Sequence, residues 1–252
     1  MNKIVLITGA TSGFGAACAD KFAAAGYDVI ATGRRGERLD ETKAMLEKKY
    51  GIRVLPLTFD VRNKTAVFKS ISALTQDWQG IDVLINNAGL ALGRDYFEEA
   101  SMDDWETMID TNVKGLLYVS RAVLPYMTSR GKGHIINLGS TAGKEVYEKG
   151  NVYCASKFSV VALSQAMRID LLRHNIKVTC INPGAAETEF SLVRFKGDAS
   201  TAAQVYSGIT PLSAGDVADV IYYTTTLPAH VCINDLVLTC TQQANSMYFY
   251  KR

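Results

Sequence analysis

Short apolar runs alternate with longer amphipathic segments along the whole chain. The apolar runs are rich in Val, Ile and Leu, and they lie at residues 4–7, 27–33, 53–59, 81–85, 134–138, 176–181 and 235–239. The segments between them have the apolar spacing of helices, at about residues 16–25, 37–50, 64–78, 103–130, 153–174 and 217–227. Strands that alternate with helices form parallel sheets whose faces the helices cover. We therefore predict an α/β protein, with one domain over residues 1–252 and a doubly wound parallel sheet of about seven strands.

Composition supports a globular protein and narrows its partners. The 252 residues are 48% hydrophobic and 21% charged, and the net charge of +2 comes from interspersed side chains rather than a basic block. Nucleic acid and membrane surfaces are therefore unexpected partners. The apolar run from Ile4 to Ile7 is too short for a signal-peptide core, so we expect a cytoplasmic protein. The five cysteines lack Cys-x-x-Cys spacing, which disfavours disulfides and a zinc site, and we expect no metal.

A glycine-rich turn follows the first apolar run. Gly9, Gly13 and Gly15 lie between that run and the first helical segment. Glycine permits tight turns, and it lets backbone N–H groups approach a pyrophosphate at the positive end of the helix. The turn predicts a dinucleotide site, although its spacing differs from Gly-x-Gly-x-x-Gly and a purely structural turn is the alternative.

Two arginines follow the second strand. A carboxylate in this place would bind the 2′-hydroxyl of NAD, whereas Arg34 and Arg35 offer charge and N–H donors to a 2′-phosphate. We therefore favour NADP as the cofactor. The alternative is that both side chains only solvate the next helix.

Small and polar residues follow the later strands. Asp60-Val61, Asn86-Asn-Ala-Gly89, Ser140 and Asn182 to Thr188 each come where an apolar run ends. The carboxyl ends of parallel strands meet at one edge, so we expect these residues to surround one site. For residues 86–89, a plain turn is the alternative. Thr111-Asn-Val-Lys-Gly115 interrupts a helical pattern, and we expect a local distortion there that exposes a carbonyl or holds a water; tolerated surface residues are the alternative.

Tyr153 and Lys157 stand four residues apart at the start of a long helical segment, which places both on one helix face. Tyrosine ionises near pH 10, so a tyrosine that transfers protons at neutral pH needs a nearby positive charge. An ammonium about 4 Å away, at an effective dielectric constant of about 20, would lower the pKa by about three units. The pair alone is weak evidence, because an exposed helix pair gives the same pattern.

The motifs are more specific as an ordered set than singly. The set is Thr8-Gly-x3-Gly-x-Gly15, Asn86-Asn-Ala-Gly89, Asn112, Ser140, Tyr153-x3-Lys157 and Pro183-Gly184 with Thr188. Over almost its whole length the chain thus resembles the short-chain dehydrogenases/reductases, which have a single-domain Rossmann fold. A closer similarity, to the bacterial NADP-dependent 3-hydroxy acid dehydrogenases, also called serine or L-allo-threonine dehydrogenases, rests on residues 31–35, 105–112, 150–153, 188–191, 193–198 and 227–231.

The resemblance implies an activity and a set of roles. That subgroup oxidises short 3-hydroxy acids such as serine, L-allo-threonine and 3-hydroxypropionate, or reduces the matching semialdehydes, as a homotetramer. The implied catalytic roles are proton exchange by Tyr153, a hydrogen bond from Ser140 to the substrate oxygen, lowering of the tyrosine pKa and ribose binding by Lys157, and a relay water held by Asn112. The implied cofactor contacts are the pyrophosphate at Gly9, Thr11, Ser12, Gly13, Phe14 and Gly15, the 2′-phosphate at Arg34 and Arg35, the adenine at Asp60 and Val61, a ribose at Asn87, and the carboxamide at Pro183, Gly184 and Thr188.

The chain departs from the subgroup on the substrate side. Lys144 to Lys149 is more charged than expected, and Ala185-Ala-Glu187 replaces a more glycine-rich loop, where Glu187 would repel a substrate carboxylate or attract an amine. We hypothesise that Arg194, in a weakly patterned substrate lid over about residues 189–215, binds the substrate acid. Surface solvation of this arginine is the alternative. The aromatic C-terminal tail either docks on a neighbouring subunit or frays.

Three other functions compete with this one. Another reductase of the same family would act on 3-ketoacyl thioesters or hydrophobic ketones. A non-catalytic NADP-sensing protein would share the fold, but the intact Ser140, Tyr153 and Lys157 argue against it. A serine hydrolase is disfavoured because Gly139-Ser-Thr-Ala-Gly143 lacks the Gly-x-Ser-x-Gly elbow.

Overall fold

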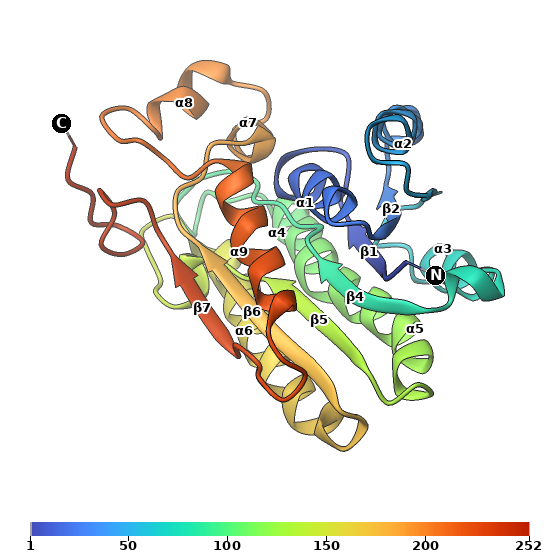
Figure 1. Ribbon diagram of the computed structural model, residues 1–252. Helices are drawn as coiled ribbons and strands as arrows, with labels where there is room; N and C mark the ends of the chain where they lie inside the picture. Colours follow the sequence, from blue (N-terminus) through green and yellow to red (C-terminus); the bar gives the residue numbers. More distant parts are fainter. Residues whose placement is uncertain (1, 252) are drawn as a thin grey trace.

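The computed structural model describes residues 2–251, which form a seven-stranded parallel sheet with helices on both faces (Figure 1). The strand order is β3-β2-β1-β4-β5-β6-β7, and all neighbouring pairs are parallel. The strands are β1 (Ile4–Thr8), β2 (Asp28–Gly33), β3 (Val54–Thr58), β4 (Ile81–Asn86), β5 (Gly133–Leu138), β6 (Ile176–Pro183) and β7 (Asp235–Leu238). The predicted α/β class and doubly wound sheet are confirmed. Strand order reverses between β1 and β4, and sheets of this kind bind dinucleotides in the crevice at that point.

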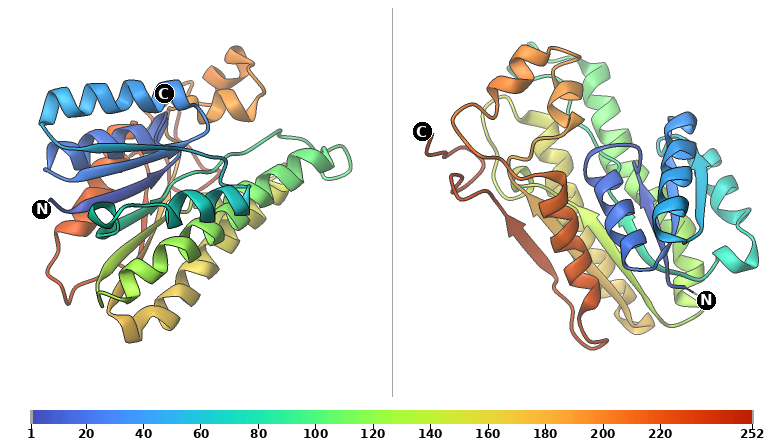
Figure 2. Two further views of the ribbon diagram at one scale, coloured as in Figure 1. Left: turned by 90° about the vertical axis from the view of Figure 1, so that its right-hand side faces the viewer. Right: turned by 45° about the horizontal axis from the view of Figure 1, so that its top comes forward.

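Both faces of the sheet are buried, which explains why its strands lack a polar face. In β1, Val5 and Ile7 pack into one cluster of buried side chains, while Ile4 and Leu6 pack into the other. The first cluster includes residues of α1 (Gly13–Ala24), α2 (Gly36–Tyr50) and α9 (Ala214–Thr226). The second includes residues of α3 (Lys64–Ser72), α5 (Leu116–Thr128) and α6 (Asn151–Leu171). Figure 2 shows these two helical layers with the sheet between them.

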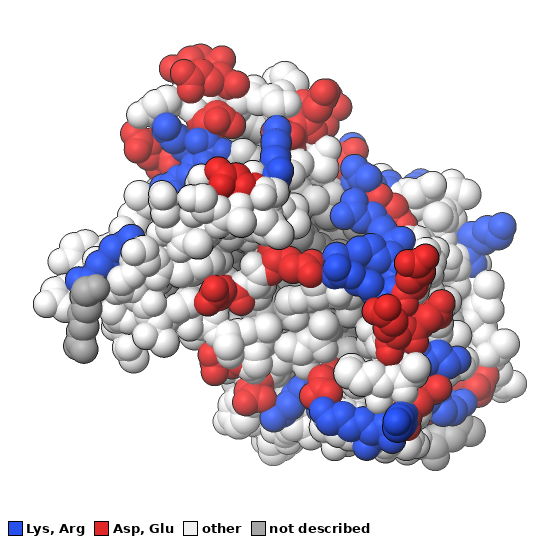
Figure 3. Space-filling view, turned by 90° about the horizontal axis from the view of Figure 1, so that it is seen from above, with Lys and Arg blue, Asp and Glu red and all other residues white. Residues whose placement is uncertain are grey.

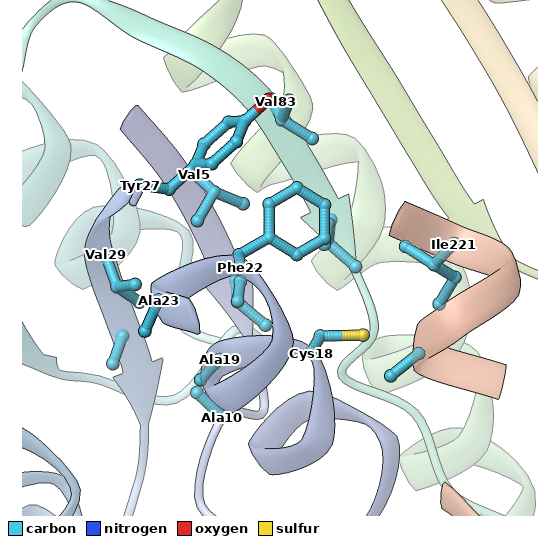
Figure 4. Packing of buried hydrophobic residues seen from close by; sticks show 14 of the residues in the cluster. Val5, Ala10, Cys18, Ala19, Phe22, Ala23, Tyr27, Val29, Val83 and Ile221 are labelled. Carbon is cyan, nitrogen blue, oxygen red and sulfur yellow. The ribbon is translucent and has the colours of Figure 1, made fainter. Parts of the chain in front are cut away.

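Phe22 of α1 anchors the first cluster. Its side chain is fully buried, and Figure 4 shows it close to Val5 and Val83. The rings of Tyr27 and Tyr222 meet it edge to face, at centroid distances of 5.0 and 5.3 Å. This packing fixes α1 against the sheet, and the N-terminus of α1 is where the glycine-rich turn ends.

The predicted helix over residues 64–78 is too long. α3 ends at Ser72, and a separate 3₁₀ turn covers Gln76–Trp78. Thr75 is extended and its hydroxyl donates to the Asp77 carboxylate, so a side chain competes here with the helical backbone. Trp78 is nevertheless buried in the second cluster, which is why the apolar spacing continues past the end of the helix.

Two other helix boundaries follow from local chemistry. α9 begins at Ala214, earlier than the predicted start at Val217, because Ser213 and Asp216 form a capping box. The predicted distortion of the long helix is confirmed, since a π-helical turn, η2 (Asp110–Gly115), joins α4 (Met102–Ile109) to α5.

The predicted lid contains two short helices, α7 (Glu189–Arg194) and α8 (Ala199–Gln204), which lie above the carboxyl edge of the sheet (Figure 1). The C-terminal tail folds back on itself through a β-bridge between Gln243 and Phe249. Within residues 2–251, no helix has the length and apolar character needed to cross a bilayer.

Candidate active site

A cavity of about 1050 Å³ opens at the carboxyl edge of the sheet, beside α7 and α8. Figure 3 looks down on this edge and shows the hollow between groups of charged side chains. The site residues predicted from the sequence line this cavity, with two exceptions, Gly15 and Asn112. The structure therefore brings together side chains that come from the ends of six strands.

The glycine-rich turn has a backbone that other residues rarely adopt. Gly9 and Gly13 have φ angles of 67° and 52°. A Cβ atom at Gly15 would overlap the Gly9 carbonyl. The side-chain amide of Asn87 donates to the carbonyls of Thr8 and Gly9, at 2.8 and 3.2 Å, and so holds the turn in place. The glycines therefore keep the backbone at the N-terminus of α1 accessible, as a pyrophosphate site requires.

The two predicted phosphate-binding arginines both line the cavity. Arg35 donates to the hydroxyls of Thr11 and Ser12, at 2.8 and 2.9 Å. It also donates to a carboxylate oxygen of Glu189 at 3.1 Å. Sequence reasoning missed Glu189, because its partner lies on a different element far away in the chain.

The predicted adenine-binding pair follows β3. The Asp60 carboxylate forms an ion pair with Arg62 at 2.7 Å. Burial alone would raise the pKa of Asp60, but the hydrogen bonds and the charge of Arg62 hold that pKa below its ordinary value. Val61 lies against Gly115 of the π-helical turn, where a Cβ atom would come within 2.8 Å of the valine side chain.

Ser140, Tyr153 and Lys157 line the same part of the cavity, as predicted. α6 carries Tyr153 and Lys157 on one face, with Lys157 Nζ 5.9 Å from the centroid of the tyrosine ring. Lys157 Nζ donates to the Leu138 carbonyl at 2.9 Å, so the end of β5 fixes the lysine. Ser140 follows β5, and its hydroxyl accepts the Ala142 N–H at 3.1 Å.

The pKa values of the central pair are set by burial. Burial raises the pKa of Tyr153 well above its ordinary value, and the Ser140 hydroxyl and the charge of Arg194 offset only part of that rise. Burial lowers the pKa of Lys157 to about 8. The pKa of Tyr153 is therefore raised rather than lowered, because burial of the phenol outweighs the groups that favour its charged form, and the lowering of this pKa by Lys157 stays a prediction.

The side chain of Asn112 is buried and already satisfied. Its amide oxygen accepts the Leu90 N–H at 2.8 Å, and its amide nitrogen donates to the Leu90 carbonyl at 2.8 Å and to the Ser156 hydroxyl at 2.9 Å. Ser156 in turn donates to the Tyr153 carbonyl at 2.7 Å. Asn112 therefore ties the Leu90 loop to α6, and its implied role of holding a relay water stays a prediction.

Arg194 ends α7 and lines the cavity beside Tyr153. Its guanidinium donates to the Gly93 carbonyl at 3.3 Å and to the Tyr147 hydroxyl at 3.1 Å, and its Cζ lies 5.5 Å from the centroid of the Tyr153 ring. None of the ion pairs found within residues 2–251 involves Arg194. Sequence reasoning missed Tyr147, whose only signal was its place in the charged segment from Lys144 to Lys149.

The loop after β6 is held by the C-terminal tail. The buried side chain of Gln243 accepts the Ala185 N–H at 2.8 Å, and Met247 and Phe249 line the cavity. Glu187 is exposed, and it is not one of the cavity-lining residues found between residues 2 and 251. It is therefore not placed to repel or attract a substrate there.

A glycine turn of the dinucleotide-binding kind, beside a half-buried Ser140 and the buried Tyr153 and Lys157, is the arrangement expected of an oxidoreductase that uses a dinucleotide cofactor. A family model described as short chain dehydrogenase matches residues 3–198. The chain belongs to the short-chain dehydrogenase family, and the resemblance found in the sequence is confirmed.

Relatives match the chain over nearly its full length. It is 50% identical over 242 residues to the NADP-dependent 3-hydroxy acid dehydrogenase YdfG of Salmonella typhi, and this match covers 96% of each chain. It is 47% identical over 253 residues to sulfoacetaldehyde reductase 2 of Chromohalobacter salexigens, and this match covers 100% of each chain. Among solved structures, the closed form of a serine dehydrogenase complexed with NADP+ superposes with a TM-score of 0.92, at 47% identity and over 99% of each chain.

Proposed function

We propose that the protein is an NADP-dependent dehydrogenase that oxidises the hydroxyl group of a short 3-hydroxy acid, or reduces the corresponding semialdehyde. The observation that carries this proposal is Arg194, a cation that lies beside Tyr153 in the cavity and that forms no ion pair with any carboxylate within residues 2–251. A substrate that presents its hydroxyl to Tyr153 and an acid group a few bonds away would satisfy both side chains. The relatives named as 3-hydroxy acid and serine dehydrogenases support the same substrate class.

The residues present fit NADP. The glycines at positions 9, 13 and 15 leave room for a pyrophosphate to approach the backbone at the N-terminus of α1. Arg34 and Arg35 line the cavity at the end of β2, and their charge and N–H donors suit a 2′-phosphate. Asn87 and Lys157 would hold the ribose units, with Pro183, Gly184 and Thr188 near the carboxamide. Bound NADP supplies the hydride acceptor for oxidation and the hydride donor for reduction.

The side chains of the site handle the proton and orient the substrate. Tyr153 would accept the hydroxyl proton at its phenolic oxygen during oxidation, and Ser140 would donate a hydrogen bond to the substrate oxygen. Lys157, held by the Leu138 carbonyl, would bring positive charge to the phenolate. Tyr147 would brace Arg194, whose guanidinium would pair with the acid group.

A sulfonate substrate is the second candidate. The guanidinium of Arg194 and the hydroxyl of Tyr147 offer N–H and O–H donors that suit a sulfonate as well as a carboxylate. The match of sulfoacetaldehyde reductase 2 over the full chain favours including it. A sulfonate differs from a carboxylate in shape, so the two classes are separable by their catalytic efficiencies.

The test follows NADPH absorbance with L-serine, L-allo-threonine, 3-hydroxypropionate and 2-hydroxyethanesulfonate, beside the uncharged 1,3-propanediol. We expect turnover with the acids and little with the diol. Tyr153→Phe should lower kcat by about 10²–10⁴ while NADPH binding persists. Arg194→Gln should lower kcat/KM for the acids by about 10- to 100-fold without changing that for the diol. Arg173→Gln, at an exposed position beyond α6, is the matched control.

The outcomes separate the competing functions. An unchanged kcat/KM in Arg194→Gln would remove the acid-binding role from this residue. NADPH binding without turnover of any acid would reject the substrate class, and 3-ketoacyl thioesters and hydrophobic ketones would be tested next. Binding without turnover of those as well would favour a non-catalytic NADP sensor.

A further inference from the structure

Glu189 connects the lid to the arginines of the cofactor site. It is the first residue of α7, and one of its carboxylate oxygens accepts a hydrogen bond from Arg35 at 3.1 Å while the other accepts one from Arg38 at 2.9 Å. Figure 3 shows acidic atoms directly against a basic patch beside the hollow. The two arginines hold the pKa of Glu189 below its ordinary value, so the carboxylate is charged at neutral pH.

Each of the three guanidinium nitrogens of Arg35 donates a hydrogen bond to another group of the protein. Its Nε and Nη2 donate to Thr11, Nη2 also donates to Ser12, and Nη1 donates to Glu189. Carboxylate and phosphate oxygens accept from a guanidinium in the same geometry. Glu189 therefore occupies a donor that a 2′-phosphate on Arg35 would use, and its negative charge opposes the arrival of a dianion.

We propose that Glu189 is a specificity-determining residue for the cofactor, an internal anion that the 2′-phosphate must displace from Arg35 and that Arg38 then retains. This inference rests on the proposed binding of the 2′-phosphate by Arg35. NAD lacks that phosphate and leaves the contact between Glu189 and Arg35 in place. The exchange occurs only with NADP. It leaves Arg38 as the arginine that holds Glu189 and the first turn of α7.

The position of α7 gives this exchange a consequence for the substrate side. The helix has six residues, with Glu189 at its start and Arg194 at its end. Arg194 lies against Gly93 and Tyr147, while the neighbouring Lys196 pairs with Asp104 of α4 at 2.8 Å. One short element thus carries both the carboxylate that competes with the 2′-phosphate and the cation that faces the substrate.

The test measures the affinity of two cofactor fragments by titration calorimetry. Adenosine 2′,5′-bisphosphate and adenosine 5′-monophosphate differ only by the 2′-phosphate, and neither reaches the substrate site. Glu189→Gln should tighten the bisphosphate by about three- to tenfold, because it removes a competing charge at a half-exposed site, and should leave the monophosphate unchanged. The matched control is Glu187→Gln, which removes the same charge two residues away at an exposed position and should change neither affinity.

A variant of Arg38 distinguishes the proposed exchange from direct attraction between Arg38 and the phosphate. Arg38→Gln should weaken the bisphosphate, because Glu189 then has Arg35 as its remaining partner, and this loss should vanish when Glu189→Gln is also present. An equal loss in both backgrounds would show that Arg38 binds the phosphate itself, and the exchange would be wrong.

Failure of this inference is distinguishable from failure of the proposed cofactor contacts. A wild-type protein that does not prefer the bisphosphate over the monophosphate would reject the role of Arg35, and the inference with it. A clear preference together with an unchanged affinity in Glu189→Gln would overturn the inference alone.

Discussion

Lys157 and Tyr153 are both buried, and burial moves their pKa values in opposite directions. Each shift favours the neutral form, because a low-dielectric surrounding penalises charge whatever its sign. The four-residue spacing of these groups predicts their attraction but not their desolvation, which depends on packing. The structure reverses the direction expected for the tyrosine pKa, and burial also lowers the lysine pKa to about 8.

Burial of the charged Lys157 ammonium lowers the free energy of unfolding of the protein at neutral pH. A lysine titrates near 10.5 in the unfolded chain and at about 8 in the folded protein, so between these values the unfolded state binds more protons. This group therefore makes the protein more stable as pH rises from about 8 to 10.5, and least stable below pH 8. Lys157→Met should raise the free energy of unfolding at pH 7 by about 1–3 kcal/mol and abolish NADP-dependent turnover.

Urea denaturation at pH 7 and pH 10 checks this prediction. The difference between Lys157→Met and the wild type should shrink at the higher pH, where the wild-type lysine is neutral in the fold. Lys64→Met, at an exposed position at the start of α3, should show no such trend. A variant that is less stable than the wild type at pH 7 would mean that the bond to the Leu138 carbonyl outweighs desolvation.

At the scale of elements, the π-helical turn η2 interrupts regular helical hydrogen bonding beside the cavity. The π-helical turn buries Asn112, whose side chain ties the Leu90 loop to α6, and it brings Gly115 against Val61. The one local distortion between α4 and α5 thus supports the cavity both beside α6 and beside Val61, where we expect catalysis and adenine binding. π-Turns of this kind are frequent at functional sites.

Gly115→Ala should weaken cofactor binding. Its Cβ would lie 2.8 Å from Val61 Cγ2, so Val61 or the turn must shift, at a cost of about 1–3 kcal/mol. We expect the Kd for NADPH, followed by its fluorescence, to rise at least severalfold. The control is Gly80→Ala, whose Cβ would meet Ile4 at an ordinary 3.7 Å. Equal NADPH affinity in the two variants would show that Val61 does not contribute to binding.

The pairing of β5 with β6 contains a buried histidine. His134 Nε2 lies 2.7 Å from the Thr179 hydroxyl, and burial lowers the pKa of His134 to about 4, helped by the charge of Lys177. The unfolded chain takes up a proton near 6.5 and the folded protein only near 4, so stability falls as pH drops through this window.

His134→Gln should flatten part of that acid dependence. Between pH 7 and pH 4.5 the wild type should lose up to about 3 kcal/mol through this residue, and the variant should not. Urea denaturation at both pH values measures the difference, with the exposed His230→Gln as control. Identical slopes for the wild type and His134→Gln would show that other groups govern acid unfolding.

At the scale of the whole molecule, apolar side chains remain exposed along one face of α6. Phe158 and Ile169 are 40% and 76% exposed and lie on the same helical face, and Leu172 follows at 76%. Exposed apolar patches of this kind mark surfaces that another protein covers. The homotetramer expected from the family resemblance stays a prediction, and this face is where we expect two copies to meet.

Charges on this face should therefore disrupt assembly. Phe158→Glu combined with Ile169→Glu should shift the mass measured by light scattering from a tetramer to smaller species. Met45→Glu, an equally drastic change at a 50% exposed methionine of α2, should leave the mass unchanged. A wild-type protein that is monomeric at micromolar concentration would contradict the prediction directly.

Much of the fold was predictable because its signals are local. Apolar runs that are buried on both faces, glycines required by positive φ, and the four-residue spacing of Tyr153 and Lys157 depend on short stretches of chain. These signals predicted the sheet, the order of its elements and the dinucleotide turn. They failed at the end of α3, where the buried Trp78 continued the apolar spacing past the last helical residue.

The sequence by itself determined the architecture and the class of chemistry, because period and residue type specify which groups reach the carboxyl edge of a parallel sheet. The tertiary structure alone decided the contacts on which the proposed substrate and cofactor preferences depend. Glu189 meets Arg35 across 154 positions of the chain, and Arg194 meets Tyr147 across 47. No local pattern encodes such pairs, and the burial that sets the pKa values of Tyr153 and Lys157 likewise exists only once distant elements have packed together.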